Sequence, residues 1–248
     1  MNFFSDLYHG FYQSIIHADR WRFYVTGFQN TMIMVSLALL IGLTIGLVLA
    51  IFKVSRRELS PHKPRSLSGR ILRFFIHVGG AFAEFYTTVI RGTPMLLQLL
   101  IAYFVIFIAA PMRYAVYIAA LAFGVNSGAY VCEIIRAGIQ SVDRGQTEAG
   151  RSLGLSSLAT MRLIILPQAV RNILPALFNE FIILIKETSV AAFIGVVDIT
   201  NAGQIVRSRV WTMWPLIFSA VIYLALVLIL TRVHKWLERR LGSYDRRS

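Results

Sequence analysis

The feature that most constrains this chain is a run without charge, Phe23–Phe52, in a protein of 248 residues. A helix rises about 1.5 Å per residue, so about 20 apolar residues cross the roughly 30 Å of hydrocarbon in a bilayer. Three further uncharged runs are Gly92–Met112, Tyr114–Cys132 and Val210–Thr231. With only 15% charged residues, the chain also falls well below the roughly one quarter that is typical of soluble domains. We therefore predict an integral membrane protein.

A fifth apolar stretch, Ile173–Val197, is interrupted by Glu180, Lys186 and Glu187. Each charge at bilayer depth costs about 3 kcal/mol on insertion scales, so these side chains are expected to face protein or water rather than lipid. We predict one all-α domain over residues 1–248. Its five spans are expected at about 24–52, 93–110, 115–139, 173–198 and 213–231. Residues 71–90 are expected to form an amphipathic helix at the interface or against the bundle, because apolar residues recur there at helical spacing.

The basic residues predict the orientation. Lys and Arg number 25 against 12 Asp and Glu, and most of them fall in 53–92, 140–172 and 232–248. The opposite side receives far fewer, namely Arg20, Arg22, Arg113, Arg207 and Arg209. Because loops rich in Lys and Arg stay in the cytoplasm, the N-terminus is predicted outside and the C-terminus inside, which requires an odd number of spans. The same distribution, between apolar runs, argues against a nucleic-acid partner.

Several other classes of site are not expected. The single cysteine, Cys132, excludes a disulfide scaffold and a CxxC metal site. The five histidines are scattered outside the core spans, so no metal site is predicted. Residues 1–22 lack the basic start, apolar core and cleavage pattern of a secretory signal, and none is expected.

The segment 141–171 is too polar for the membrane and has the pattern of two short helices. Residues 146–153 contain good helix formers and precede Gly154, which readily adopts the left-handed conformation that closes a helix. Ser156 or Ser157 can cap a second helix. Neither a nucleophile beside a base nor metal ligands at usable spacing occur there, so we predict a cytoplasmic docking element rather than a catalytic one.

The same segment carries a spaced motif. Glu148-Ala149-Gly150, three residues, Gly154, nine residues and then Ile164-Ile165-Leu166-Pro167 resemble the EAA loop in the membrane subunits of ABC importers. The family pattern is EAA, three residues, G, nine residues and I-x-L-P. Only Gly150 departs from it, in place of Ala, which is expected to loosen the first helix. Pro167 is expected to limit or kink the second helix.

Further motifs resemble those of polar amino-acid permeases. They are Arg91-Gly92-Thr93-Pro94 before the second span, Asn126-Ser127-Gly128-Ala129-Tyr130 in the third, and Asn179-Glu180-Phe181 with Lys186-Glu187-Thr188-Ser189 in the fourth. The resemblance implies the five-span, MetI-like fold of a type I importer in the bacterial cytoplasmic (inner) membrane, where the loop couples to an ATPase. The coupling residues it implies are Glu148, Ala149, Gly150, Arg151, Leu153, Gly154 and Leu155.

The resemblance also implies partners. They are two ABC ATPase subunits that bind ATP and Mg, an identical or homologous second permease subunit, an external solute-binding protein, membrane lipid and a polar amino acid as substrate. The chain itself is expected to hold no cofactor and to catalyse nothing, because it contains no GxxxxGK[ST] phosphate-binding loop.

Polar residues in spans three and four are the candidates for a substrate pathway: Asn126, Tyr130, Glu133, Glu180, Lys186 and Glu187. Glu180 and Glu187 are seven residues apart and share a helix face, which suits a zwitterionic or cationic amino acid. A structural ion network between helices is an equal alternative, in which Lys186 neutralises Glu187 or Glu133.

Two other functions compete with the importer hypothesis. An autonomous secondary transporter or channel for small polar solutes would suit the charges in the fourth span, but five spans give no inverted repeat and the cytoplasmic loop would have no role. A membrane enzyme is disfavoured because HExxH, paired-acid and activated-serine motifs are missing from the sequence.

Overall fold

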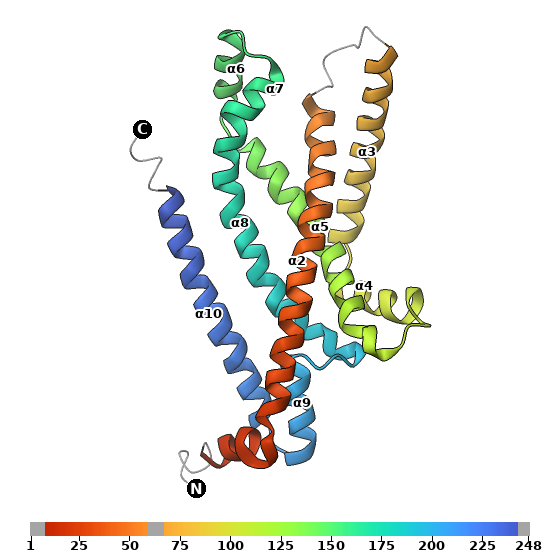
Figure 1. Cartoon of the computed structure of the whole chain (residues 1–248), viewed down its shortest axis with the longest axis vertical. Coiled ribbons are helices and arrows are strands. Elements are labelled where there is room, and N and C mark those ends of the chain that lie inside the picture. The colour runs from red at the N-terminus through yellow and green to blue at the C-terminus, as the bar shows by residue number, and fades with distance from the viewer. Residues whose placement is uncertain (1–7, 59–66, 243–248) are drawn as a thin grey trace. The chain divides into compact units, whose positions relative to one another are not determined.

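The computed structural model describes residues 8–58 and 67–242, and the elements assigned in these ranges are helices (Figure 1). The label η marks a 3₁₀ or π turn. In chain order the elements are η1 Tyr12–Ile16, η2 His17–Asp19, α2 Trp21–Glu58, α3 Leu67–Arg91, α4 Met95–Ile101, η3 Ala102–Ile106, η4 Met112–Tyr114, α5 Ala115–Gln140, α6 Arg144–Ser152, α7 Ser157–Thr160, η5 Met161–Ile165, α8 Leu166–Glu187, η6 Thr188–Ile194, α9 Ile199–Val210 and α10 Trp214–Gly242.

Three of the predicted spans are long apolar helices in the structure. Helices α2, α5 and α10 cover the predicted spans 24–52, 115–139 and 213–231, apart from one residue at the start of the last. Each of these helices is long and apolar enough to cross a membrane. Hydropathy alone therefore located them correctly.

The predicted span 93–110 differs from the structure. Helix α4 passes into the π turn η3, which ends at Ile106, and twelve residues of helix rise only about 18 Å. Together with α3 this segment passes the length and hydropathy criterion for a span, but the pair is bent by 103° at the break. The structure thus has three helices that could cross a membrane, or four if this bent pair counts as one, within the part of the chain that it describes.

The predicted span 173–198 also has different limits. Helix α8 begins earlier, at Leu166, and ends at Glu187, after which a 3₁₀ turn leads to Gly195 at a φ of 79°. A left-handed backbone closes a helical segment, so the helix cannot continue to residue 198. Helix α8 is not among the described helices that pass the span criterion by themselves.

Helix α3 confirms the helical periodicity expected over 71–90, but its polar side packs inward. Gly80, Ala83 and Thr87 are buried, and the ring of Phe52 in α2 lies where a side chain at Gly79 would begin. The large apolar residues point outward instead: Ile71, Leu72, Phe74, Phe75, Val78, Phe82, Phe85 and Val89 are exposed. Small residues on one side allow close helix approach, and apolar residues on the other suit lipid.

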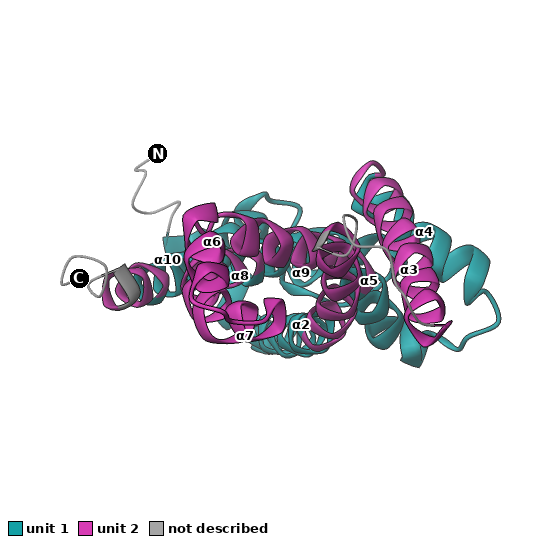
Figure 2. Ribbon diagram, turned by 90° about the horizontal axis from the view of Figure 1, so that it is seen from above, with its two compact units in different colours: residues 1–39, 94–124, 181–233 teal, residues 40–93, 125–180, 234–248 magenta. Residues whose placement is uncertain are grey.

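The chain divides into two compact units, coloured separately in Figure 2. One unit comprises residues 1–39, 94–124 and 181–233, and its core packs Met34, Phe123 and Leu184 together. The other comprises residues 40–93, 125–180 and 234–248, with a smaller core that includes Leu49, Ala83 and Cys132. The segment 141–171 belongs wholly to the second unit.

Candidate functional site

The predicted helix–turn–helix lies between α5 and α8 (Figure 1). Helix α6 ends at a turn in which Gly154 has a φ of 84°, so the prediction that this glycine closes the helix is confirmed. The N–H of Gly154 donates to the carbonyl of Arg151 at 3.0 Å, and the N–H of Leu155 donates to the carbonyl of Gly150 at 3.1 Å. These two bonds form a Schellman motif, which satisfies carbonyls that the helix end would otherwise leave unpaired. The Arg151 side chain adds a bond of 2.8 Å to the carbonyl of Leu155.

Side-chain caps start both helices of the hairpin. The Asp143 carboxylate accepts from the N–H of Gly145 at 2.6 Å, and the Ser156 hydroxyl accepts from the N–H of Ala159 at 3.2 Å. Both bonds satisfy N–H groups that the first turn of a helix leaves unpaired. Of the two serines predicted as possible caps, the structure therefore uses Ser156.

The expectation that Pro167 limits the second helix is wrong, and the alternative, a kink at this residue, stays a prediction. Helical backbone continues from α7 through the π turn η5 into α8, and Pro167 lies in the first turn of α8. A proline inside an α-helix clashes with the carbonyl four residues earlier, here that of Leu163. The wider π turn directly before Pro167 relieves this clash and keeps the helical path unbroken. The hairpin of α6 and α7 is thus joined to α8 by continuous helical backbone.

Gly150, the one departure from the EAA pattern, lies at the closest approach of the two hairpin arms. It is buried, and a Cβ at this position would lie 2.8 Å from Cγ2 of Thr160 and 2.9 Å from Cδ1 of Ile164. Real Cβ atoms essentially never come so near another side chain. The expectation that Gly150 loosens the helix therefore omits its tertiary effect, which is to let α6 pack directly on α7 and η5.

The remaining residues predicted to couple to an ATPase mostly face outward. Leu153 is 82% exposed at the tip of the hairpin, and Leu158 on α7 is 78% exposed. The other coupling residues are Glu148, Ala149, Arg151 and Gly154, all exposed, and Leu155, which is half-buried. Glu148 also lines a pocket of about 470 Å³ together with Arg57 and Arg144. The hairpin is therefore a rigid turn that presents leucines to its surroundings.

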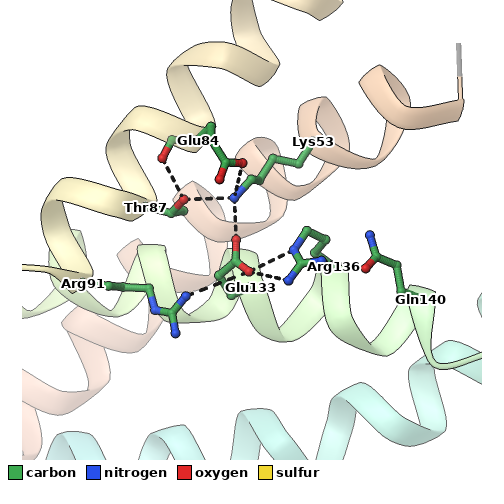
Figure 3. Close-up of polar contacts among 7 residues, drawn as sticks. All are labelled: Lys53, Glu84, Thr87, Arg91, Glu133, Arg136 and Gln140. Carbon is green, nitrogen blue, oxygen red and sulfur yellow. Dashed lines mark hydrogen bonds and ion pairs between the residues drawn. The ribbon is translucent and has the colours of Figure 1, made fainter. Parts of the chain in front are cut away.

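A cluster of charges joins α2, α3 and α5, as Figure 3 shows. The Glu133 carboxylate accepts from Lys53 Nζ at 2.5 Å and from Arg136 at 2.9 and 2.7 Å. Lys53 is also 2.9 Å from the Glu84 carboxylate, and its side chain is only 7% exposed. Arg91 lies 3.9 Å from Glu133. We call these five residues, Lys53, Glu84, Arg91, Glu133 and Arg136, the ion cluster.

The ion cluster gives Glu133 partners that the sequence analysis did not identify. The sequence suggested Lys186 as a counter-ion, whereas Lys53 and Arg136 form the ion pairs of Glu133 in the structure. Arg136, three residues beyond Glu133, could have been paired with it by helical spacing, which brings such residues together. Lys53 ends the uncharged run and gave no such signal. Tyr130, another pathway candidate, carries the guanidinium of Arg91 over its ring at 5.4 Å.

Glu180 lies buried between α8 and α5. Its exposed fraction is 6%, and its carboxylate accepts from the Ser127 hydroxyl at 2.9 Å. The neighbouring Asn126 is also buried, at 3% exposed. The Ser127 hydroxyl therefore forms a hydrogen bond between helices α5 and α8.

Lys186 and Glu187 end helix α8 and differ in exposure. Lys186 is exposed, whereas Glu187 is half-buried. Among the ion pairs of the described residues, none joins either side chain to a partner. The predicted ion pair of Lys186 with Glu187 is therefore not among those of the described residues.

A second polar site was missed altogether. Asp198 is fully buried, caps α9 by accepting from the N–H groups of Thr200 and Asn201, and accepts from the Tyr223 hydroxyl at 3.0 Å. Its place after an apolar run and before Ile199 was the available signal, because Asp is a preferred N-cap. Among the described residues, no group of three or more His, Cys, Asp or Glu side chains could hold a metal ion.

Comparisons with known proteins agree with these features. Residues 69–243 match the family described as binding-protein-dependent transport system inner membrane component. The chain is 38% identical over 221 residues to the putative glutamine transport system permease protein GlnP of Rickettsia conorii, which covers 88% of this chain and 93% of that one. It is 39% identical over 229 residues to the arginine transport system permease protein ArtQ of Bacillus subtilis, covering 90% and 94%.

Solved structures show the same fold. A crystal structure of an amino acid ABC transporter with histidines superposes with a TM-score of 0.76 at 35% identity, covering 97% of this chain and 99% of that one. The MetNI methionine ABC transporter, at 16% identity and covering 89% and 97%, has a TM-score of 0.64 and supports the fold alone. By the match over most of its length and by its relatives, this chain belongs to the family of binding-protein-dependent transport system inner membrane components.

Proposed function

We propose that this permease imports polar amino acids, and that it couples ATP hydrolysis by a partner ATPase to their passage across the bacterial inner membrane. Relatives named for glutamine and arginine transport support the substrate class. The partners we propose are two ATPase subunits with their ATP and Mg, an identical or homologous second permease, and an external solute-binding protein. No chemical step is assigned to this chain.

We propose five crossings, with the N-terminus outside and the C-terminus in the cytoplasm. The basic segments 53–92, 140–172 and 232–248 support this orientation, because Lys and Arg are retained on the cytoplasmic side. In this arrangement the α3–α4 pair contributes to one crossing and α8 to another. The coupling hairpin then faces the cytoplasm.

One observation carries the coupling role, namely the exposure of Leu153 at a turn whose own hydrogen bonds are complete. The Schellman bonds and the Arg151 contact hold the turn without help from another protein. An exposed leucine gains about 1.5–3 kcal/mol when it is buried in a partner. A rigid, apolar tip of this kind suits a cleft in the ATPase, and the unbroken path from α7 into α8 would transmit its movement to the bundle.

Substitution at Leu153 tests this role. Leu153→Asp is expected to weaken ATPase binding roughly 10- to 100-fold, because a charge replaces the apolar contact. Leu153→Met, which keeps an apolar side chain of similar size, is the matched control and should retain the ATPase. The measurement is the ATPase recovered with the affinity-tagged permease, alongside the melting temperature of each variant. Full recovery with Leu153→Asp would refute docking at this tip.

We also propose a substrate pathway past Asn126, Tyr130, Glu180, Lys186 and Glu187, and we assign Glu133 to the ion cluster. Acidic residues within membrane helices usually mark a pathway for a polar solute. Glu187→Gln is expected to change the kinetics of uptake into proteoliposomes while the complex still assembles. Unchanged kinetics would return Glu187 to a structural role.

The energy source separates the proposed importer from an autonomous transporter. Proteoliposomes that contain the full complex and internal ATP should accumulate labelled polar amino acids only when the external binding protein is added. Accumulation by this chain alone, driven by an ion gradient, would instead support a secondary transporter.

A further inference from the structure

A pocket of about 580 Å³ lies where the N-terminal segment meets the end of α9 and the start of α10. Its described lining residues are His9, Gly10, Gln13, Arg20, Arg209, Val210, Thr212 and Trp214, all from one compact unit. Two arginines and a histidine are among them, and none is Asp or Glu. The pocket therefore suits an anionic ligand.

The Arg20 side chain is held in place by hydrogen bonds to Gln13. It is only 9% exposed, and its guanidinium donates to the backbone carbonyl of Gln13 and, at 3.4 Å, to the Gln13 side chain. The two preceding residues, Ala18 and Asp19, have φ values of 54° and 53°, a left-handed conformation that non-glycine residues seldom adopt. Such strain persists only where the surrounding structure over-determines it, and it tends to gather at functional sites.

Arg209 approaches the same pocket from α9. Its guanidinium carbon lies over the Phe23 ring, 4.7 Å from the ring centroid, while the residue stays exposed. The neighbouring acid, Asp19, is 3.4 Å from Arg22 and is thus engaged elsewhere. No described residue that lines the pocket therefore neutralises the positive charge of Arg20 and Arg209.

The depth of the pocket relative to a membrane follows from two spans of the same unit. The helices that could cross a membrane begin at Trp21 in α2 and at Trp214 in α10, and the Tyr24 hydroxyl donates to the carbonyl of Pro215 at 3.1 Å. The N-terminal ends of α2 and α10 therefore lie at the same depth relative to a membrane. Trp and Tyr concentrate at the boundary between hydrocarbon and water, and Trp211 beside the pocket is 90% exposed. The pocket consequently lies at the depth of lipid headgroups.

We propose that Arg20 and Arg209 bind the phosphate of an anionic glycerophospholipid in this pocket. Guanidinium groups recognise phosphate oxygens through paired hydrogen bonds. A headgroup that carries an ammonium, such as that of phosphatidylethanolamine, finds no carboxylate among the described lining residues, which favours a headgroup with net negative charge. The assignment to the outer leaflet rests on the orientation given under the proposed function, but the site itself does not.

The test uses the full-length chain in nanodiscs of phosphatidylcholine that contain increasing amounts of phosphatidylglycerol, followed by native mass spectrometry of retained lipid. The full-length chain should retain phosphatidylglycerol in preference to phosphatidylcholine. Arg209→Gln should bind it about fivefold more weakly, since an arginine near the surface contributes about that factor to anionic-lipid binding. Arg113→Gln is the matched control, because Arg113 is an exposed arginine of the same unit that stacks on Tyr114 and lies outside the pocket.

Three results would overturn the assignment. Equal retention by Arg209→Gln and the unsubstituted chain would exclude the pocket as the lipid site. Release of the lipid by millimolar inorganic phosphate would indicate a site for a free anion. Unchanged lipid retention together with a lost response to the external binding protein would make the pocket a protein-docking surface. Because lipid retention needs neither ATPase nor transport, failure here is distinct from failure of the proposed function.

Discussion

Removing the carboxylate of Glu133 is the most informative single perturbation of this fold. Glu133 accepts from Lys53 and Arg136 and lies near Arg91, so it is the anion that three cations share. Glu133→Gln keeps the shape of the side chain and removes its charge. The cluster would then hold three cations with Glu84 as their remaining anion.

The expected loss of folding stability in Glu133→Gln follows from the burial of its partner, Lys53. Lys53 is 7% exposed, and breaking a buried ion pair by removing one partner costs about 3–5 kcal/mol. Lys53 keeps its contacts with Glu84 at 2.9 Å and with Thr87 at 3.0 Å, which moves the expected loss for Glu133→Gln to the lower end, about 3 kcal/mol. Glu84→Gln should cost less than about 1 kcal/mol, because that side chain is 65% exposed.

A double-mutant cycle measures the interaction energy between Lys53 and Glu133. Lys53→Met together with Glu133→Gln removes both charges, so it should be less destabilising than the sum of the single substitutions by about 2 kcal/mol. The assay is unfolding of the purified full-length chain in detergent, followed by tryptophan fluorescence. Glu84→Gln is the control for an exposed member of the same cluster.

Additive single substitutions, or a loss below about 1 kcal/mol for Glu133→Gln, would refute the reasoning, because both require that Lys53 and Glu133 do not depend on each other. A large loss with Glu84→Gln would also contradict it. That result would mean that the exposed carboxylate, rather than Glu133, holds Lys53 in the interior.

Three further predictions concern the hairpin and the α5–α8 contact. Gly150→Ala should raise amide hydrogen exchange in α6, because overpacking against Thr160 costs about 1–3 kcal/mol and exceeds the roughly 1 kcal/mol gained in helix propensity. The second substitution Thr160→Ser should restore protection from exchange. A more protected α6 in Gly150→Ala would contradict the packing argument. Gly154→Ala should destabilise the turn by about 1–2 kcal/mol because its φ is positive, and unaltered exchange at the end of α6 would disprove this. Ser127→Ala should lower stability by about 1–3 kcal/mol, since a donor to the buried Glu180 is lost, and a melting temperature equal to that of the unsubstituted chain would show that this bond is dispensable.

Local features of the fold were predictable from the sequence. The long uncharged runs indicated α2, α5 and α10, and Gly154 and Ser156 marked the turn and the cap of the hairpin. Such features depend on residues within a few positions of one another, and their energies are large enough to act before distant contacts form. The spaced motif from Glu148 to Pro167 indicated the family by its resemblance to the EAA loop.

Tertiary structure alone decided which helix faces meet. Hydropathy cannot tell an apolar face that contacts lipid from one that contacts protein, so the inward side of α3, with Gly80 and Ala83, was not foreseen. The pairing of Lys53 with Glu133 joins residues 80 positions apart, and the role of Gly150 depends on Thr160 in another helix. The sequence by itself determined where the helices are and how the hairpin turns. The long-range packing of their side chains determined which charges are neutralised, because that depends on distances which no local pattern specifies.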